Sequence, residues 1–206
     1  MPPSSIDWNA RYLTADTPWD SGKPSQELAR ILSEGWVQPC RALEMGCGTG
    51  TNAVFLATQG FEVTALDLAG PAVEQARARA ARAGVHVHFL QADVLALPEL
   101  GPAFPFVFDR GVYHHVREVD LDRFLEFLAR VCEPGGFYLT LAGNANEPAP
   151  AEGGPPRVHA HEISLELAPL FDLVQLREFR FDGVCIQGRE VHPLAWSALL
   201  RRKPPA

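Results

Sequence analysis

Short apolar runs alternate with amphipathic segments through the middle of the chain. Apolar and β-branched residues predict strands that end near Gly46 and then cover residues 61–67, 85–90, 104–108 and 137–141. Between them, apolar residues at helical spacing predict helices over residues 51–59, 71–83 and 121–132, the second of which would end at Gly84. Regular strand–helix alternation predicts an α/β fold with a doubly wound, mostly parallel sheet.

The two ends of the chain depart from that alternation. Before the first strand, amphipathic helices are expected at residues 6–13 and 25–36. After the last parallel strand, residues 143–156 are rich in Ala, Pro and Gly and predict a mobile loop. A short helix near residues 163–167 and two β-rich runs, at 171–181 and 190–200, complete the predicted elements.

Composition favours one domain without a nucleic-acid or membrane partner. The 206 residues are 47% hydrophobic, and we predict a single domain with a helical cap at 1–36 and a core at 37–206. The formal charge of −7 weighs against binding to nucleic acid or an anionic membrane. Four scattered cysteines without a C-x-x-C pair predict a reducing compartment and no zinc site. Since no apolar run has membrane-spanning length, we expect a cytoplasmic protein, whose oligomeric state stays open.

Glycines stand at every second position where the first strand ends, at Gly46, Gly48 and Gly50. Because glycine has no Cβ, the backbone of this turn can approach a ligand closely, and the next helix aims its first N–H groups at the same place. A strand, a glycine turn and a helix form the first unit of a nucleotide-binding α/β sheet. The dinucleotide fingerprint G-x-G-x-x-G would need a glycine where this chain has Thr51, which weakens an NAD(P) interpretation without excluding it.

An acid follows each of the next two predicted strands. Asp67 lies about twenty residues past Gly46, where the second strand of a doubly wound sheet ends, and a carboxylate there can accept both ribose hydroxyls of a nucleotide. Asp93 follows the third predicted strand. A lone Asp in that place is more often a turn residue, but its register with the two upstream motifs favours ligand contact.

The pattern Glu-x-Gly-x-Gly-x-Gly that starts at Glu44 resembles motif I of the class I S-adenosylmethionine (SAM) methyltransferases. In that family the glycine turn lies beside the methionine part and the ribose of SAM, and an acid after the third strand reads the adenine amino group. The resemblance implies SAM as cofactor and a Rossmann-like sheet of seven strands with an antiparallel C-terminal strand. The cofactor contacts that it implies are Trp19, Glu44, Gly46, Cys47, Gly48, Asp67, Leu68, Asp93, Val94 and Asp109.

Two more segments narrow the resemblance. Residues 17–24 include the sequence Pro-Trp-Asp-Ser-Gly, and residues 109–116 begin with Asp-Arg-Gly. Both resemble motifs of the group that contains thiopurine, tellurite-resistance and plant thiol/halide methyltransferases. That group implies a small-molecule acceptor, methylated at sulfur or another soft heteroatom. Because aromatic faces suit a sulfonium, Trp19 with Trp8 and Tyr12 could close the methionine end of the site as a lid, or Trp8 and Tyr12 could simply pack their helix on the body.

Arg110 and His114 are the candidate catalytic residues. Arg110 could bind an acceptor or form an ion pair with Asp109 or Asp20, and the resemblance favours the acceptor. His114 and His115 would project in different directions from a helix, so at most one of them faces the ligand. A neutral histidine there could deprotonate an acceptor near pH 7, or the pair could be structural. The thiopurine branch lacks this pair, which leaves its substrate open here.

The sequence therefore predicts SAM-dependent methyl transfer to a small-molecule acceptor. One alternative is a SAM-binding sensor or partner subunit without catalysis. Another is an NAD(P)-dependent oxidoreductase, which Thr51 and the terminal pair of β-rich runs disfavour. No metal site is expected, because His159 and His161 lack further ligands nearby, and Cys47 is interpreted as a small space-filling residue.

Overall fold

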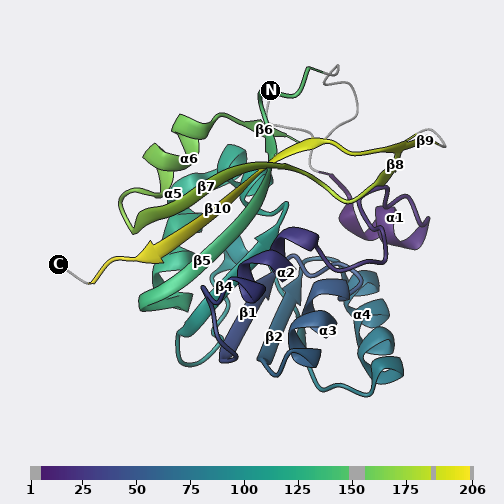
Figure 1. The fold of residues 1–206 in the computed structure, drawn as a ribbon. Helices are drawn as coiled ribbons and strands as arrows, with labels where there is room; N and C mark the ends of the chain where they lie inside the picture. The colour runs from purple at the N-terminus through teal and green to yellow at the C-terminus, as the bar shows by residue number, and fades with distance from the viewer. Residues whose placement is uncertain (1–5, 149–155, 187–188, 205–206) are drawn as a thin grey trace.

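The computed structural model describes residues 6–148, 156–186 and 189–204, and its centre is a sheet with the strand order β3-β2-β1-β4-β5-β10-β7 (Figure 1). In chain order these strands are β1 (Arg41–Met45), β2 (Glu62–Asp67), β3 (His88–Gln91), β4 (Phe104–Arg110), β5 (Cys132–Asn144), β7 (Phe171–Arg180) and β10 (Leu194–Arg202). A short strand, β6 (Arg157–Val158), pairs with the end of β5. β8 (Val184–Ile186) and β9 (Arg189–Val191) form a separate antiparallel hairpin.

Helices cover both faces of the sheet because strand side chains alternate between them. On one face, Ala42 and Phe106 pack with residues of α2 (Gln26–Ser33), α3 (Thr51–Thr58) and α4 (Gly70–Ala83). On the other, Leu43 and Val107 pack with α5 (Tyr113–Val131) and α6 (Ala160–Leu167). A further helix, α1 (Trp8–Leu13), lies against α4, outside these two layers.

The predicted fold class is confirmed. Strands β1 to β5 pair in parallel, while β10 lies antiparallel between β5 and β7. The seven-stranded path and the antiparallel C-terminal strand are those expected, and β6 is an addition that the sequence did not reveal. Within the described part of the chain, no helix combines the length and the apolar character needed to cross a membrane.

Several element boundaries differ from the sequence prediction. α5 starts at Tyr113, well before residue 121, and kinks at Asp120, whose φ of −160° is not helical. The Asp120 carboxylate accepts the N–H of Arg123 at 2.9 Å, so the predicted start at residue 121 is the start of the second, separately capped part. α2 ends at Ser33 instead of residue 36, and the left-handed Gly35, with φ +78°, follows it.

The end of α5 also runs differently. β5 begins at Cys132 instead of residue 137, and residues 134–136, Pro-Gly-Gly, lie inside it at an irregularity, because Phe104 pairs with Cys132 but Phe106 already pairs with Phe137. In the predicted loop 143–156, residues 143 and 144 still belong to β5, and residues 149–155 lie outside the described residues.

The strand order places the topological switch beside β1. β1 pairs with β2 on one side and with β4 on the other, so the connections after β1 and β4 leave the sheet toward opposite faces. The carboxyl ends of the two strands nevertheless meet, and there an ideal Cβ on Gly46 would lie 2.3 Å from Cγ2 of Val112. The glycine turn is therefore packed directly against the turn that follows β4.

This contact generates a stability prediction. Gly46→Ala combines a left-handed φ of +61° with the steric conflict at Val112, whereas Gly84→Ala has a similar φ of +67° and nothing within 4 Å of the new Cβ. We expect Gly84→Ala to lower the free energy of unfolding by about 1–2 kcal/mol, and Gly46→Ala to lower it clearly more. Urea unfolding measures both. Adding Val112→Ala to Gly46→Ala should recover part of the loss, and equal losses in the two single variants would contradict the packing argument.

Candidate active site

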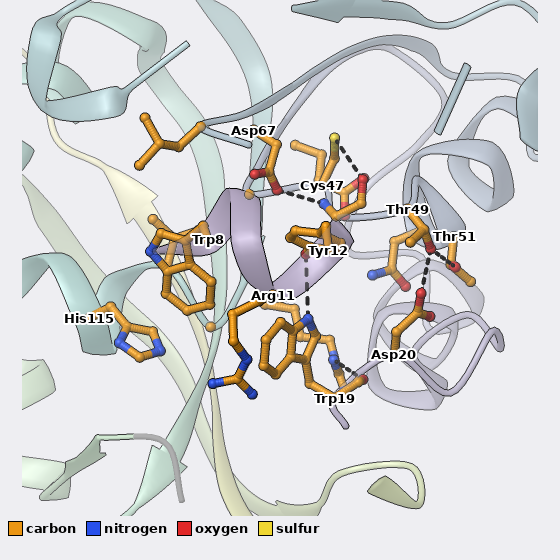
Figure 2. Close-up of a pocket in the computed structure, with 18 of the residues that line it drawn as sticks. Trp8, Arg11, Tyr12, Trp19, Asp20, Cys47, Thr49, Thr51, Asp67 and His115 are labelled. Atoms are coloured by element: carbon orange, nitrogen blue, oxygen red, sulfur yellow. Dashed lines mark hydrogen bonds between the residues drawn. The ribbon is translucent and has the colours of Figure 1, made fainter. Parts of the chain in front are cut away.

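A cavity of about 320 Å³ lies where the carboxyl ends of β1, β2 and β4 meet the N-terminal segment (Figure 2). Its walls come from the glycine turn, the loops after β2, β3 and β4, α1 with the segment after it, and Phe181 and Pro193 near the β8–β9 hairpin. The position agrees with the general rule that open α/β sheets bind ligands at the switch point. Most of the residues predicted for the site line this cavity.

The glycine turn is fixed by the acid at the end of β2. Oδ2 of Asp67 accepts the N–H of Gly48 at 2.8 Å, and Oδ1 accepts the N–H of Ala69 at 2.9 Å. Cys47 donates its N–H to the carbonyl of Leu66 at 2.9 Å, so β1 and β2 hold the turn together. Burial raises the pKa of Asp67, and these backbone N–H groups oppose that rise.

Glu44 is a buried acid in the cavity wall with one carboxyl oxygen unpaired within the described part of the chain. Its side chain is 1% exposed, lines the cavity, and its Oε2 has no hydrogen-bond partner among the described residues. Burial, with a smaller contribution from Asp67, raises the pKa of Glu44 to about 8. A buried, unpaired carboxyl oxygen facing a cavity is costly unless a ligand donor meets it. The ammonium group of a SAM methionine part is such a donor, so the residues present fit this cofactor.

The loops after β2 and β3 contribute Leu68, Asp93 and Val94 to the cavity wall, and all three were predicted from sequence. Asp93 precedes a 3-10 helix at Val94–Ala96, and its Oδ1 accepts the N–H of Leu95 at 2.8 Å. The turn role weighed for this acid is therefore present, and the side chain lines the cavity at the same time. Leu68 is exposed, lines the same cavity and offers an apolar surface.

Asp109 is the predicted contact that the structure does not bring to the cavity. It is fully buried and absent from the cavity wall. Oδ1 accepts the N–H groups of Val112 and Tyr113 at 2.8 and 3.1 Å, and Oδ2 accepts the hydroxyl of Tyr138 at 2.6 Å. These contacts make Asp109 the cap of the β4–α5 turn. We therefore do not retain it among the candidate cofactor contacts.

Aromatic side chains of the N-terminal segment cover the cavity, as Figure 2 shows. Trp8 meets Trp19 edge to face with ring centroids 5.6 Å apart, and Trp19 donates its indole N–H to the hydroxyl of Tyr12 at 3.4 Å. Tyr12 is buried and packs against Ala69 and Ala72 at the start of α4. These aromatics therefore pack on the body and also form a wall of the cavity, while their action as a lid stays a prediction.

Two hydrogen bonds fasten this segment to the sheet. Thr49 of the glycine turn donates its hydroxyl to Oδ2 of Asp20 at 2.6 Å, and Arg79 donates to the same hydroxyl at 3.0 Å. Arg110 donates to the backbone carbonyl of Trp19 at 3.0 Å. The sequence motifs indicated Trp19 and Asp20 but not these partners, because Thr49 and Arg79 carry no signal of their own.

Arg110 reaches the cavity from the end of β4. Its guanidinium carbon lies 4.7 Å from the ring centroid of Phe181, a residue that the sequence did not mark as functional. No carboxylate among the described residues lies within ion-pair distance of Arg110, so neither predicted pairing, with Asp109 or with Asp20, is formed. Burial lowers the pKa of Arg110, while the charges of Asp182 and Asp20 oppose that shift. A largely buried cation with unused donors is a site for an anion.

The adjacent histidines occupy different environments. His114 is almost fully buried, and its Nδ1 accepts the N–H of Gly143 at 2.9 Å. His115 lies edge to face with Trp8, at 5.1 Å between centroids, and burial lowers its pKa to about 4. Both line the cavity, which differs from the expectation that at most one would face the ligand. Among the described residues, no three His, Cys, Asp or Glu side chains are grouped as metal ligands.

Comparisons with known proteins agree with this geometry. A family model described as a methyltransferase domain matches residues 42–136. A ubiquinone biosynthesis O-methyltransferase of Paracidovorax citrulli is 30% identical over 194 residues, which cover 85% of this chain and 81% of that protein. A probable thiol methyltransferase of Arabidopsis thaliana is 29% identical over 170 residues, 81% of this chain and 74% of its own.

Solved structures show the same fold. A structure determined in work on the conversion of a disulfide bond into a thioacetal group during echinomycin biosynthesis superimposes with a TM-score of 0.80. It is 26% identical and the match covers 95% of this chain and 90% of that one. Structures of SAM-dependent methyltransferases recur among the other similar folds. The chain belongs to the class I SAM-dependent methyltransferases. Its cofactor is SAM, and the NAD(P)-dependent alternative is set aside.

Glu44 generates a pH prediction. The pKa of Glu44 in the folded protein lies above its ordinary value of 4.5. Ionisation of Glu44 therefore costs the folded state free energy, so the protein loses stability as pH rises from 4.5 toward 8, and the loss is complete above about pH 8. Glu44→Gln should therefore raise the unfolding temperature of the free protein at pH 7 to 8. The same change should weaken S-adenosylhomocysteine binding, because the ligand ammonium loses its ionised partner.

Calorimetry from pH 5.5 to 7.5 measures both effects. In the wild type we expect proton release on binding and an affinity that rises with pH, approaching tenfold per pH unit. Glu44→Gln should show neither. Equal pH dependence in the two proteins would contradict the contact with the ammonium group.

Proposed function

We propose that this methyltransferase transfers the methyl group of SAM to a small molecule whose nucleophilic atom is already ionised, with a thiolate sulfur as the first choice. The observation that carries the proposal is Arg110, a cation in the cavity wall without an ion-pair partner among the described residues. A small acceptor suits the cavity, since aromatic side chains enclose it on the side away from the sheet.

The cofactor is assigned to the sheet side of the cavity. Glu44 would meet the methionine ammonium, Gly46 and Gly48 would lie under the methionine and ribose, and Asp67 would accept from the ribose hydroxyls. The adenine would lie between Leu68, Asp93 and Val94. Asp67 can do this while holding the glycine turn, because each carboxylate oxygen has a second lone pair. Trp19 and Tyr12 would cover the methionine end, and Cys47 would contribute its backbone.

The two histidines in the described part of the cavity wall are poor proton acceptors. Nδ1 of His114 is already occupied by Gly143. His115, with a pKa of about 4, is a weak base for a hydroxyl near pH 7. Asp20 accepts from Thr49 and from the N–H of Gly22, so its carboxylate holds the N-terminal segment in place and would have to release these contacts to take up a proton. We therefore expect slow methylation of an acceptor that the protein must deprotonate, and faster methylation of an acceptor that ionises in solution.

This environment favours sulfur over oxygen. A thiol with a pKa of about 8.5 supplies a useful fraction of anion at neutral pH, whereas a phenol near 10 supplies far less. SAM provides, when bound, a methyl group on a sulfonium. The chain itself then has only to bind the acceptor, orient it and exclude water from it. Arg110 would attract and hold the anion, and the aromatic wall would exclude water. The names of the two relatives support both an S- and an O-acceptor, so the acceptor atom needs its own test.

A matched pair of acceptors provides that test. We expect benzenethiol to be methylated at least 100-fold faster than phenol at pH 7, in kcat/KM, because only the thiol is substantially ionised. A tritiated-methyl assay measures both. Similar rates for the two would argue against the ionised-acceptor proposal, and a preference for phenol would move the function to oxygen.

Arg110 provides the second test. Arg110→Gln should raise the KM for benzenethiol about tenfold or more, through loss of a charge-assisted contact, while S-adenosylhomocysteine affinity stays within a factor of about three. Arg177→Gln serves as the control, because Arg177 is a surface arginine paired with Glu27 away from the cavity. If Arg110→Gln lost cofactor binding, Arg110 would be a cofactor contact, or a structural residue that holds the Trp19 carbonyl, and not an acceptor contact.

The N-terminal segment is proposed to act as a lid, because three of its aromatics and two hydrogen bonds close the cavity. Hydrogen exchange over residues 6–23 should slow when S-adenosylhomocysteine is added. Thr49→Val, which removes the hydroxyl that holds Asp20, should raise exchange in the free protein and reduce the ligand effect. Unchanged exchange on adding ligand would identify the segment as a packed part of the body.

A further inference from the structure

The Gly143 amide determines the tautomer of His114. A backbone N–H can only donate, so the 2.9 Å contact requires a free lone pair on Nδ1 of His114. In a neutral imidazole the proton must then be on Nε2. Gly143 lies near the end of β5, where its own register partner is Arg157 of β6. The tautomer is therefore fixed by the sheet and not by helix α5, which carries the histidine.

The surroundings keep this ring neutral. His114 is 3% exposed, and the groups that face it are His115 on the same helix, Arg110 from β4 and Arg117 one turn along α5. Burial, followed by these neighbours, lowers the pKa of His114 well below its ordinary value. Glu162 and Glu166 bind Arg117 and show no contact with His114. A proton taken up at Nδ1 would also have to displace the Gly143 contact.

The other end of the ring is turned to the cavity. His114 lines the cavity, its Nδ1 accepts from Gly143, and no hydrogen bond within the described residues engages its Nε2. The nearest constraint is Gly111, where an added Cβ would lie 3.4 Å from Nε2. Gly111 has a φ of +96°, so glycine suits this turn and leaves the space beside Nε2 open.

We propose that His114 binds the methyl acceptor as a fixed hydrogen-bond donor through Nε2–H, and that it does not act as a general base. The assignment rests on the proposed function. Together with the guanidinium of Arg110, it gives the acceptor side two donors, one charged and one neutral, on either side of Gly111. Such a pair holds an anionic nucleophile in place and favours its ionised form. It would select acceptors with a hydrogen-bond-accepting atom at the reacting end over purely apolar molecules.

Two amide substitutions separate the two ends of the ring. Asn at position 114 places an amide oxygen near Nδ1 and keeps the Gly143 contact while removing the donor. Gln places an amide N–H near Nε2 and keeps the donor. With benzenethiol as the probe, His114→Asn should lower kcat/KM by about 10- to 100-fold and move the midpoint of the kcat–pH profile to higher pH. His114→Gln should stay within about fivefold of the wild type, with an unshifted midpoint.

The reverse order, with Asn the more active variant, would reduce His114 to a structural partner of Gly143. If both variants lost the acid limb of the kcat–pH profile, His114 would be a general base and the donor proposal would be wrong. Unfolding temperature and S-adenosylhomocysteine affinity of each variant exclude a folding effect, and the Asn variant remains informative if Gln destabilises β5.

A measurement without turnover separates this inference from the proposed function. Nitrogen-15 NMR of the histidines in the S-adenosylhomocysteine complex should show His114 as the Nε2–H tautomer from pH 5 to 9. The Nδ1–H tautomer, or a titration of His114 in that range, would overturn the donor assignment. The expected tautomer without any thiol turnover would overturn the thiol proposal and leave the donor geometry supported.

Discussion

The close approach of the turns after β1 and β4 is the constraint on which the site depends. Gly46 leaves no room for a side chain because Val112 fills the space, and Val112 is held there by the Asp109 carboxylate that caps the start of α5. Tyr138 of β5 fixes the same carboxylate from the next strand. A buried acid outside the cavity wall thus helps to determine where the glycine turn lies. The geometry here is fixed by packing across the switch point, not by the turn alone.

Buried ionisable groups of both signs line the cavity. The acids Glu44 and Asp67 are assigned to the cofactor, and the guanidinium of Arg110 is assigned to the acceptor. Each of these groups is costly to bury alone, and each is matched by an opposite charge or a donor on the proposed ligand. The free protein therefore carries a cost that ligand binding offsets, which couples stability to occupancy. Stored electrostatic cost of this kind is typical of functional sites rather than of structural ones.

Much of the fold and of the cofactor side could be predicted because the signals are local. The strands, the helices at 51–58 and 70–83, the left-handed glycines and Asp67 all follow from short patterns with one physical cause each. The kink at Asp120 and the irregularity in β5 could not be predicted, since they depend on partners in other strands and on a local cap. Asp109 illustrates the same dependence on partners: its position at a strand end led to its prediction as a cofactor contact, and only the structure shows that both carboxylate oxygens accept internal hydrogen bonds outside the cavity wall.

The acceptor side resists prediction because it is assembled from distant segments. Arg110 ends β4, Trp19 comes from the N-terminal segment, and Phe181 comes from the approach to the β8–β9 hairpin. Of these three, only Arg110 falls within residues 42–136, which the methyltransferase family model matches. The family assignment therefore determines the cofactor and the reaction, while under the proposed function acceptor choice would depend largely on segments outside the region that the family model matches. The proposed tautomer of His114 follows the same logic, since a backbone amide 29 positions away occupies Nδ1 and leaves Nε2 as the nitrogen that could meet an acceptor. Chemistry at the acceptor is thus a property of the tertiary structure, and variants in the N-terminal segment and the hairpin approach are where acceptor specificity should change with little effect on SAM.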